Sequence, residues 1–432
     1  MKPLVCILLL AISFSPDFKS AQAGPTETVT WIFLNSGASR DKTKSMTHEE
    51  VGKMQAEHVG NFGTQFNRGT LIAAGPLGDN GFIRGTVILA VHEPDQVADC
   101  FKTDPFVHND ILAVEPHPWL VDVMKFGTPQ VPFQLAQHTL CIVKKGEHWR
   151  PSGSRPSTDS MIELFPRLKE QARSGALGIS GPFLDGGDKV GLLLFYSSNY
   201  AQIRAEMEKE SPVRAGQVQL EFHPQFMGRG TLRDPQEDVS PPKSGKRRRL
   251  FDGRSFAGWE GETNHTWRIE GGALVGGSLT ETVPHNEFLC TQRRFKNFDL
   301  RAKVKLEGTG FVNGGIQFRS ERIKEPPFEM TGYQADMGEG YWGSLYDESR
   351  RNKVLAHTHA AVLKHVLKTN DWNDYILRCE DSHIRLWLNG VLTVDYTEDD
   401  KQMPLSGLIA LQIHGGGKAR AWYKDITIEE LQ

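Results

Sequence analysis

The sequence predicts a multidomain protein in which two ferredoxin-like α+β domains precede an all-β sandwich. The chain has 432 residues, more than one ordinary hydrophobic core accommodates. Its first half contains the same strand–helix pattern twice, and beyond residue 250 short strands separated by turns replace helical periodicity. We expect a signal peptide at 1–23, α+β domains at 24–130 and 131–230, a linker at 231–249 and the sandwich at 250–432.

Composition narrows the classes of partner. Hydrophobic residues make up 38% of the chain and charged residues 24%, with 43 Gly and 9 Trp, which is typical of a globular, β-rich protein. The net charge of -3 gives no general attraction to nucleic acid or anionic membranes, so we expect no nucleic-acid partner. No segment after the N-terminal leader is apolar for long enough to span a bilayer. The oligomeric state is left open.

The N-terminus has the features of a secretory leader. Lys2 supplies a positive charge, residues 4–14 are apolar, and Ala21-Gln22-Ala23 forms an A-x-A cleavage site. We therefore expect an exported protein, periplasmic or extracellular, whose mature chain starts at Gly24. The mature chain would keep Cys100, Cys141, Cys290 and Cys379, which lack CxxC spacing and are expected to be buried thiols, with a Cys290–Cys379 disulfide as the alternative.

The order of elements in the first domain is β-α-β-β-α-β, which predicts a ferredoxin-like fold. The first helix begins with a capping box, in which Thr47 is the N-cap and Glu50 lies three residues on. A second helix is expected at 94–101, and strands at 29–34, 71–74, 86–91 and 112–116.

The pattern then recurs. Residues 69–77 align with 175–183 without a gap, and 114–118 align with 220–224, at a spacing of about 106 residues. An internal duplication is the simplest explanation.

The first copy resembles the YCII-related domains through His58, Gly75-Pro76-Leu77, the strand 85–91 and Asp104-Pro105-Phe106. That resemblance implies an active-site pair of His58 and Asp104, in which the carboxylate would raise the basicity of the imidazole. A structural hydrogen bond is the alternative. The second copy has Leu164 and Ser211 at the matching positions, so we expect it to be a degenerate scaffold half.

A Pro-containing, basic segment precedes the last domain, and glycine-containing turns mark hairpins within that domain. Residues 238–249 contain Pro241-Pro242 and the basic run 246–249, and we expect a solvated hinge there. Beyond it, Gly271-Gly272 and Asn389-Gly390 mark hairpins in a succession of short strands that predicts a two-sheet sandwich.

Two strands of this sandwich alternate apolar and polar residues. Alternation places Gln317, Arg319 and Glu321 on one face of the first strand, and Gln334 and Asp336 on one face of the second. We expect the two strands to lie in one sheet, so that these polar faces adjoin. Carboxylates, amides and a guanidinium together suit a hydroxyl-rich ligand, whereas surface ion pairs on a solvated face are the alternative. Further residues expected at the ligand are Tyr341, Trp342, Tyr346, Trp387, Gln412 and His414.

This half of the chain resembles the 3-keto-disaccharide hydrolase family. The segments that carry the resemblance include 250–253, 267–276, 315–321, 332–336, 340–348, 387–390 and 411–414. The resemblance implies a concanavalin-like β-sandwich, or jelly roll, that acts on 3-keto-glucosides or disaccharides. In that chemistry a base removes the C2 hydrogen, the glycosidic oxygen leaves C1, and water adds back.

The resemblance suggests roles for the polar residues. Glu321 and Asp336 are the acid/base candidates, Arg319 would contact the enolate, and His414 would carry a second proton. Gln317, Gln334 and Gln412 would orient hydroxyl groups. The expected activity is thus that of a glycoside hydrolase or lyase; the alternatives are a non-catalytic carbohydrate-binding module and a protein–protein scaffold.

The sequence identifies no certain cofactor. A divalent metal at the carboxylates stays open, and His357, His359 and His365 are spaced so that they could hold one, although we expect surface histidines there. The identity of the sugar and its linkage are also left open.

Overall fold

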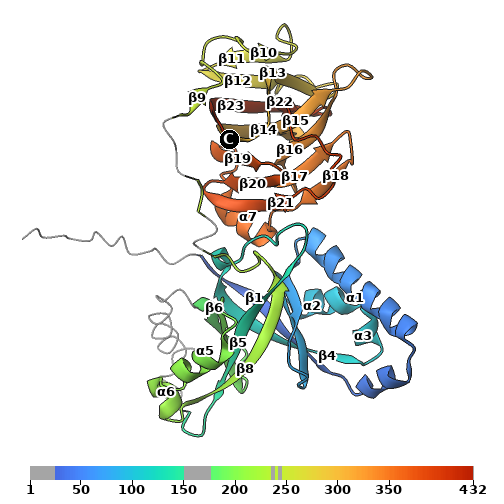
Figure 1. Cartoon of the computed structure of the whole chain (residues 1–432), viewed down its shortest axis with the longest axis vertical. Coiled ribbons are helices and arrows are strands. Elements are labelled where there is room, and N and C mark those ends of the chain that lie inside the picture. The colour runs from blue at the N-terminus through green and yellow to red at the C-terminus, as the bar shows by residue number, and fades with distance from the viewer. Residues whose placement is uncertain (1–24, 150–176, 235–238, 242–245, 432) are drawn as a thin grey trace, which may run out of the picture.

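The computed structural model describes residues 25–149, 177–234, 239–241 and 246–431 (Figure 1). The expected leader and Leu164 lie outside these ranges. Two α/β units form the lower half of the molecule in Figure 1, and a two-sheet sandwich forms the upper half. Within the described ranges, no helix combines the length and apolarity needed to cross a bilayer.

The first α/β unit has the predicted order of elements. Its strands are β1 (Thr26–Ser36), β2 (Leu71–Pro76), β3 (Ile83–Leu89) and β4 (Leu112–Asp122), and its helices are η1 (Arg40–Ser45), α1 (His48–Asn67), α2 (Pro94–Phe101), α3 (Pro105–His108) and η2 (Val123–Lys125). The antiparallel sheet has the order β2-β3-β1-β4. The predicted capping box is confirmed, because Thr47 accepts from the Glu50 amide and the Glu50 side chain accepts from the Thr47 amide.

The second α/β unit repeats this sheet. Its elements are β5 (Leu135–Lys145), β6 (Leu177–Pro182), β7 (Lys189–Phe195), α5 (Tyr200–Met207), α6 (Ser211–Arg214) and β8 (Val218–Gly228). The strand order β6-β7-β5-β8 corresponds strand for strand to that of the first unit.

The two sheets pack face to face, and equivalent contacts recur across the junction. Trp119 bridges to Phe183, while Gln225 bridges to Leu77. Trp119 donates to the Gly181 carbonyl at 2.9 Å. The side chain of Gln225 lies 3.3 Å from the equivalent Gly75 carbonyl. Large apolar residues of both sheets form one core between them, among them Trp31, Phe33, Trp119, Phe183 and Leu192.

The sandwich consists of two antiparallel sheets around a second part of that core. One sheet has the order β10-β13-β22-β15-β16-β17-β18, and the other β11-β12-β23-β14-β19-β20-β21. The strands are β10 (Trp259–Glu260), β11 (Trp267–Glu270), β12 (Ala273–Gly277), β13 (Glu287–Phe295), β14 (Phe298–Gly310), β15 (Asn313–Arg322), β16 (Met330–Gly338), β17 (Leu345–Glu348), β18 (Lys353–Ala356), β19 (Asn373–Glu380), β20 (His383–Leu388), β21 (Val391–Thr397), β22 (Gly407–Ile413) and β23 (Gly417–Glu430). One helix, α7 (Ala360–Val366), lies between the sandwich and the α/β units (Figure 1).

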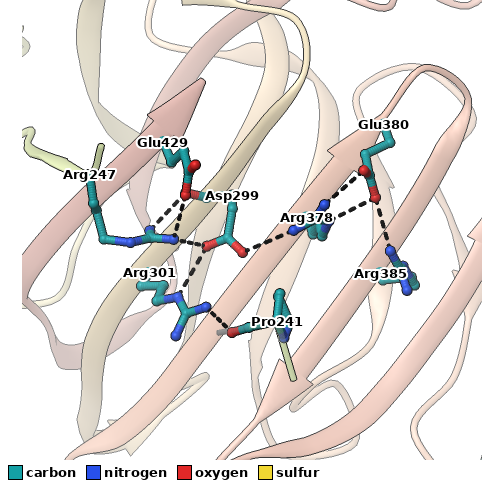
Figure 2. Close-up of polar contacts among 8 residues, drawn as sticks. All are labelled: Pro241, Arg247, Asp299, Arg301, Arg378, Glu380, Arg385 and Glu429. Atoms are coloured by element: carbon teal, nitrogen blue, oxygen red, sulfur yellow. Dashed lines mark hydrogen bonds and ion pairs between the residues drawn. The ribbon is translucent and has the colours of Figure 1, made fainter. Parts of the chain in front are cut away.

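The end of the basic run is part of the sandwich, which corrects the expectation of a solvated hinge. Arg248 and Arg249 form β9 and pair with β23. Arg247 donates to buried Asp299 at 2.5 Å, within a network that also contains Arg301 (Figure 2). Figure 2 shows this network continuing through Arg378 and Glu380 to Arg385, and its Arg301 also contacts the Pro241 carbonyl. Because Asp299 is 1% exposed, these arginines are the cations that compensate its burial.

The four described cysteines are buried and free, as expected for structural thiols. Cys290 lies on β13 and contacts Met330, whereas Cys379 lies on β19 of the other sheet, so the alternative disulfide is not formed.

Candidate functional site

A polar surface covers the face of the seven-stranded sheet that points away from the sandwich core. Antiparallel register brings its residues together: Gln317 lies opposite Gln334, and Gly315 lies opposite both Asp336 and Gln412. The intervening residues Ile316 and Ala335 point into the core. The alternation predicted for this part of β15 and β16 is therefore confirmed.

The side chains on this surface form a hydrogen-bond network around Asp336. Its Oδ1 accepts from the side chain of Asn313 at 3.1 Å and from the Met337 amide at 2.8 Å. Gln334 donates to Gln412 at 3.0 Å, and Gln412 lies 3.3 Å from Glu348. Gln334 also donates to Asp336 Oδ1 at 3.4 Å, so the carboxyl groups of Asp336 and Glu348 are joined through two amides.

Both carboxyl groups are shifted toward the protonated form. Burial raises the pKa of Asp336 to about 8, against the hydrogen bond from Asn313, and the charge of Glu348 adds to the rise. Burial also raises the pKa of Glu348 to about 7, with a further contribution from the charge of Glu329. Two neighbouring carboxyls with pKa values near neutrality can exchange protons with a substrate.

Gln317 is fully buried on the same surface, yet neither polar atom of its side chain has a hydrogen-bond partner among the described residues. The side-chain oxygen of Gln334 is also unpartnered there. Unsatisfied buried amides are costly, so these atoms would gain from a hydrogen-bond partner, but a ligand's hydroxyl group reaches them only if the side chains that cover them move.

A β-bulge in β15 corrects the predicted positions of Arg319 and Glu321. Arg319 has a φ of 50°, and three residues of β15 span the distance of two on both neighbouring strands. The extra residue reverses the alternation beyond it. Arg319 donates to the Lys296 carbonyl at 3.0 Å, and Glu321 is exposed and pairs with Arg294 at 2.5 Å, so neither belongs to the network around Asp336.

The bulge instead brings Arg322 toward the polar surface. Arg322 pairs in register with Met330, which packs against Phe288 and Cys290, and its guanidinium donates to the Phe288 carbonyl at 3.1 Å. The charge of Arg322 also acts on the nearby Glu287. Arg322 is therefore the guanidinium of β15 that lies on this side of the sheet.

Two of the four predicted aromatic contacts lie beside the carboxyls. Tyr346 is opposite Gln334 in register and its ring is 6.4 Å from that of Tyr341, both half-buried. Trp342 is buried in the sandwich core, 6.3 Å from the Tyr375 ring, and Trp387 is fully buried on the other sheet. The prediction that Trp342 and Trp387 line the ligand surface is therefore wrong.

His414 follows β22 directly and adjoins the network. Its backbone amide donates to the Asn313 carbonyl at 3.0 Å, and the Asn313 side chain reaches Asp336. Its Nδ1 lies 2.7 Å from the Gly415 carbonyl, which orients the half-buried ring. His414 thus contacts Asn313, which in turn donates a hydrogen bond to Asp336.

Three residues of this site were missed by reasoning from sequence: Asn313, Arg322 and Glu348. A signal for Glu348 was present, because it lies two residues after Tyr346 on the same strand and therefore shares its face. No local signal revealed Arg322, since its orientation depends on the bulge.

The three histidines considered as metal ligands have separate surroundings. His365 pairs with Glu27 at 2.5 Å, and His357 is half-buried. His359 is 3% exposed, which corrects the expectation of a surface residue, and it packs against Phe66 of α1. Within the described ranges, no group of three or more His, Cys, Asp or Glu residues is arranged to hold a metal ion.

A second pair of titratable groups lies in the first α/β unit. His58 Nδ1 is 2.6 Å from Asp104 Oδ2, and Asp104 is fully buried. The other oxygen of Asp104 accepts from the amides of Phe106 and Val107, so the carboxylate caps α3 and also orients the imidazole. The predicted contact between His58 and Asp104 is formed, and its role stays a prediction.

Comparisons with solved structures give several matches at low identity. A glycosyl hydrolase, described as putative, from Parabacteroides distasonis ATCC 8503 is 19% identical, with 45% of this chain and 100% of that chain covered and a TM-score of 0.34. The carbohydrate binding module CBM66 from Bacillus subtilis is 16% identical, with coverage of 40% and 96% and a TM-score of 0.32. A Bacillus subtilis protein of unknown function with a galectin-like fold is 10% identical, with coverage of 44% and 98% and a TM-score of 0.35.

The comparison with curated proteins found no match. A protein-family model does match the part of the chain that contains the sandwich. Residues 246–429, under half of the chain, match the family described as the 3-keto-alpha-glucoside-1,2-lyase-like domain.

Proposed function

We propose that the sandwich cleaves 3-keto-glucosides or related oxidised disaccharides by elimination and hydration. The observation that carries this proposal is the pair of buried carboxyls, Asp336 and Glu348, whose pKa values lie near neutrality on a surface rich in amides. The family match over residues 246–429 supports the same chemistry. Asp336 keeps the role expected from the sequence, while Glu348 replaces Glu321.

The reaction needs one group to accept a proton and another to donate one. The ketone at C3 acidifies the C2 hydrogen; a base removes it, the electrons form the C1–C2 double bond, and the C1–oxygen bond breaks. The leaving oxygen takes a proton, and water then adds its hydroxyl to C1 and a hydrogen to C2. We assign the base to Glu348, with the lower pKa, and the acid to Asp336, which keeps its proton to a higher pH.

Other residues would bind and orient the sugar. Gln317, Gln334 and Gln412 have amide groups suited to hydroxyls, and Tyr341 and Tyr346 offer rings at the partly exposed edge. Arg322 would stabilise the enolate, and His414 would relay a proton.

The test is turnover of 3-keto and unmodified glucosides by the full chain and three variants. Asp336→Asn and Glu348→Gln should each lower kcat by about 100-fold or more, with substrate still bound. Glu321→Gln is the matched control, because Glu321 is an exposed carboxylate on the same sheet, and it should retain activity. Equal loss in all three variants would argue against this assignment of the site.

A carbohydrate-binding module is the second candidate, favoured by the unpartnered amide of Gln317. It predicts sugar binding with no turnover of any keto substrate, and affinity that depends on Gln317 more than on Asp336.

For the rest of the chain, we propose an exported protein whose α/β units are a duplicated pair of ferredoxin-like, YCII-like domains. Support comes from the strand orders β2-β3-β1-β4 and β6-β7-β5-β8 and from the A-x-A motif at Ala21. N-terminal sequencing of the secreted protein, expected to start at Gly24, tests export.

A further inference from the structure

A cavity of about 850 Å³ lies where the first α/β unit meets the sandwich. Its walls come from α1, β2 and β3, from the segment 128–135, and from residues 354–357 at the end of β18. Asp336 and Glu348 are not among its lining residues, so this cavity is separate from the polar surface of the sandwich. Its volume is in the range of sites that bind small organic molecules.

Most of the cavity wall is apolar and much of that is aromatic. Phe62, Phe66 and Phe106 line it from the helical side of the first unit, and Phe133 and Leu355 from the opposite side. Phe133 is 63% exposed, so this part of the wall is open to solvent. The wall therefore suits a flat apolar group.

Two arginines line the same cavity. Arg40 comes from η1 and Arg84 from β3, and neither forms an ion pair with any residue in the described ranges. Arg84 donates to the Gly81 carbonyl at 3.3 Å, which leaves its positive charge uncompensated. Burial lowers the pKa of Arg40, and the charge of Arg84 lowers it further, which indicates that the two guanidinium groups are close.

Uncompensated like charges beside an apolar wall favour an anionic ligand. A carboxylate matches the planar donor geometry of arginine and would neutralise the repulsion between the two side chains. His58 adds a hydrogen-bonding group, because it lines the cavity and Asp104 engages only its Nδ1.

The sandwich fixes the other side of the cavity. The Val131 amide donates to the Asp395 carbonyl at 3.0 Å, and Gln130 donates to the Asp395 side chain at 2.9 Å, which ties the segment 128–135 to β21. His357 lines the cavity from the sandwich. The cavity wall thus comes from the first α/β unit, from the sandwich and, through Leu135 and Gly228, from the second α/β unit.

We propose that this cavity binds a small aromatic carboxylate, with the carboxylate between Arg40 and Arg84 and the ring among the phenylalanines. The ligand would contact both the first α/β unit and the sandwich. The proposal is independent of the glycoside-cleaving function, since none of the carboxyls and amides around Asp336 lines this cavity.

The experiment is calorimetric titration of the full chain with benzoate, phenylacetate and 3-phenylpropionate, each compared with its neutral amide. At least one acid should bind about tenfold or more tightly than its amide, equivalent to about 1.4 kcal/mol. Arg40→Gln and Arg84→Gln should each weaken binding of that acid by about fivefold or more.

Arg214→Gln is the control, because Arg214 is exposed on α6 of the other α/β unit, and it should leave binding unchanged. Thermal melting of each variant checks that folding is intact, and His357→Ala should also weaken binding, because the ligand contacts the sandwich wall. The proposal is overturned if no acid binds better than its amide, or if binding survives both cavity substitutions unchanged.

Discussion

His223 Nδ1 lies 2.7 Å from Asp79 Oδ2, across the junction of the two α/β units. The equivalent contact joins His117 to Asp185 at 2.5 Å. The other ring nitrogen of His223 faces Glu221 at 2.9 Å, and that of His117 faces Glu115 at 3.0 Å. Each histidine thus contacts one carboxyl group of its own unit and one of the other unit, and forms a clamp between the two halves of the repeat.

We predict that removing either clamp destabilises the junction. Asp79→Asn and Asp185→Asn should each lower the free energy of unfolding by about 1–3 kcal/mol, because each weakens a hydrogen bond to a buried histidine. Denaturant unfolding at pH 7 measures this change. Asp95→Asn, at an exposed position in the first turn of α2, should lower the free energy of unfolding by less than about 1 kcal/mol, because only its interaction with the helix N-terminus is lost. Similar losses in all three variants would contradict a specific role for the clamps.

A second prediction concerns the pH dependence of stability. Since the pKa of Asp336 is raised to about 8 from 3.8, the folded protein keeps a proton that the unfolded chain loses, and stability falls as pH rises through that interval. This one group contributes a slope of about 1.4 kcal/mol per pH unit.

Asp336→Asn should therefore remove this slope. The unfolding free energy of the variant should fall less between pH 5 and pH 8 than that of the wild-type protein. Unfolding free energies measured across the interval would check it. Glu321→Gln should keep the wild-type slope, and an unchanged slope in Asp336→Asn would mean that this carboxyl is ionised at neutral pH.

A third prediction concerns Gly315, the residue over which the Gln334 side chain lies. A Cβ at this position would be 2.6 Å from two carbons of Gln334 and 3.0 Å from the Ala335 carbonyl oxygen. Gly315→Ala should displace Gln334, break its hydrogen bond to Gln412 and weaken substrate affinity by about tenfold. Titration with a keto-glucoside checks the affinity.

The control for this change is Gly52→Ala on α1, where an added Cβ would meet nothing within 4 Å. It should leave affinity unchanged. If Gly315→Ala bound substrate normally, the position of Gln334 would have no part in sugar binding.

A fourth prediction concerns His359, which is buried between α7 and α1. Burial lowers its pKa to about 4 from 6.5, so the imidazole is neutral in the folded protein while the unfolded chain takes up a proton below pH 6.5. The stability that this group contributes is complete above pH 6.5 and is lost as pH falls toward 4. At pH 5 the loss amounts to about 2 kcal/mol.

His359→Phe should therefore reduce the difference in unfolding free energy between pH 7 and pH 5. His92→Phe, at an exposed position, is the control. An equal pH 7-to-5 difference in wild type and His359→Phe would show that His359 is not responsible for it.

Local and repeated features of this protein were determined by the sequence alone. The capping box at Thr47 depends only on residues within one turn, so its prediction succeeded. The repeated strand order could be predicted because equivalent residues keep their spacing, as in the contacts of Gly75 and Gly181. Alternation placed Gln334 and Asp336 on one face because strand geometry has a fixed period.

What only the tertiary structure decided depends on contacts between distant segments. The bulge at Arg319 removed Glu321 from the predicted site and brought Arg322 toward it, because both neighbouring strands pass one fewer residue there. The walls of the arginine-lined cavity come in part from β3 and β18, which lie far apart in the sequence. An alternating pattern predicts which residues share a face only as long as the strand is regular. The position of a bulge depends on the packing of neighbouring strands, which the pattern does not contain.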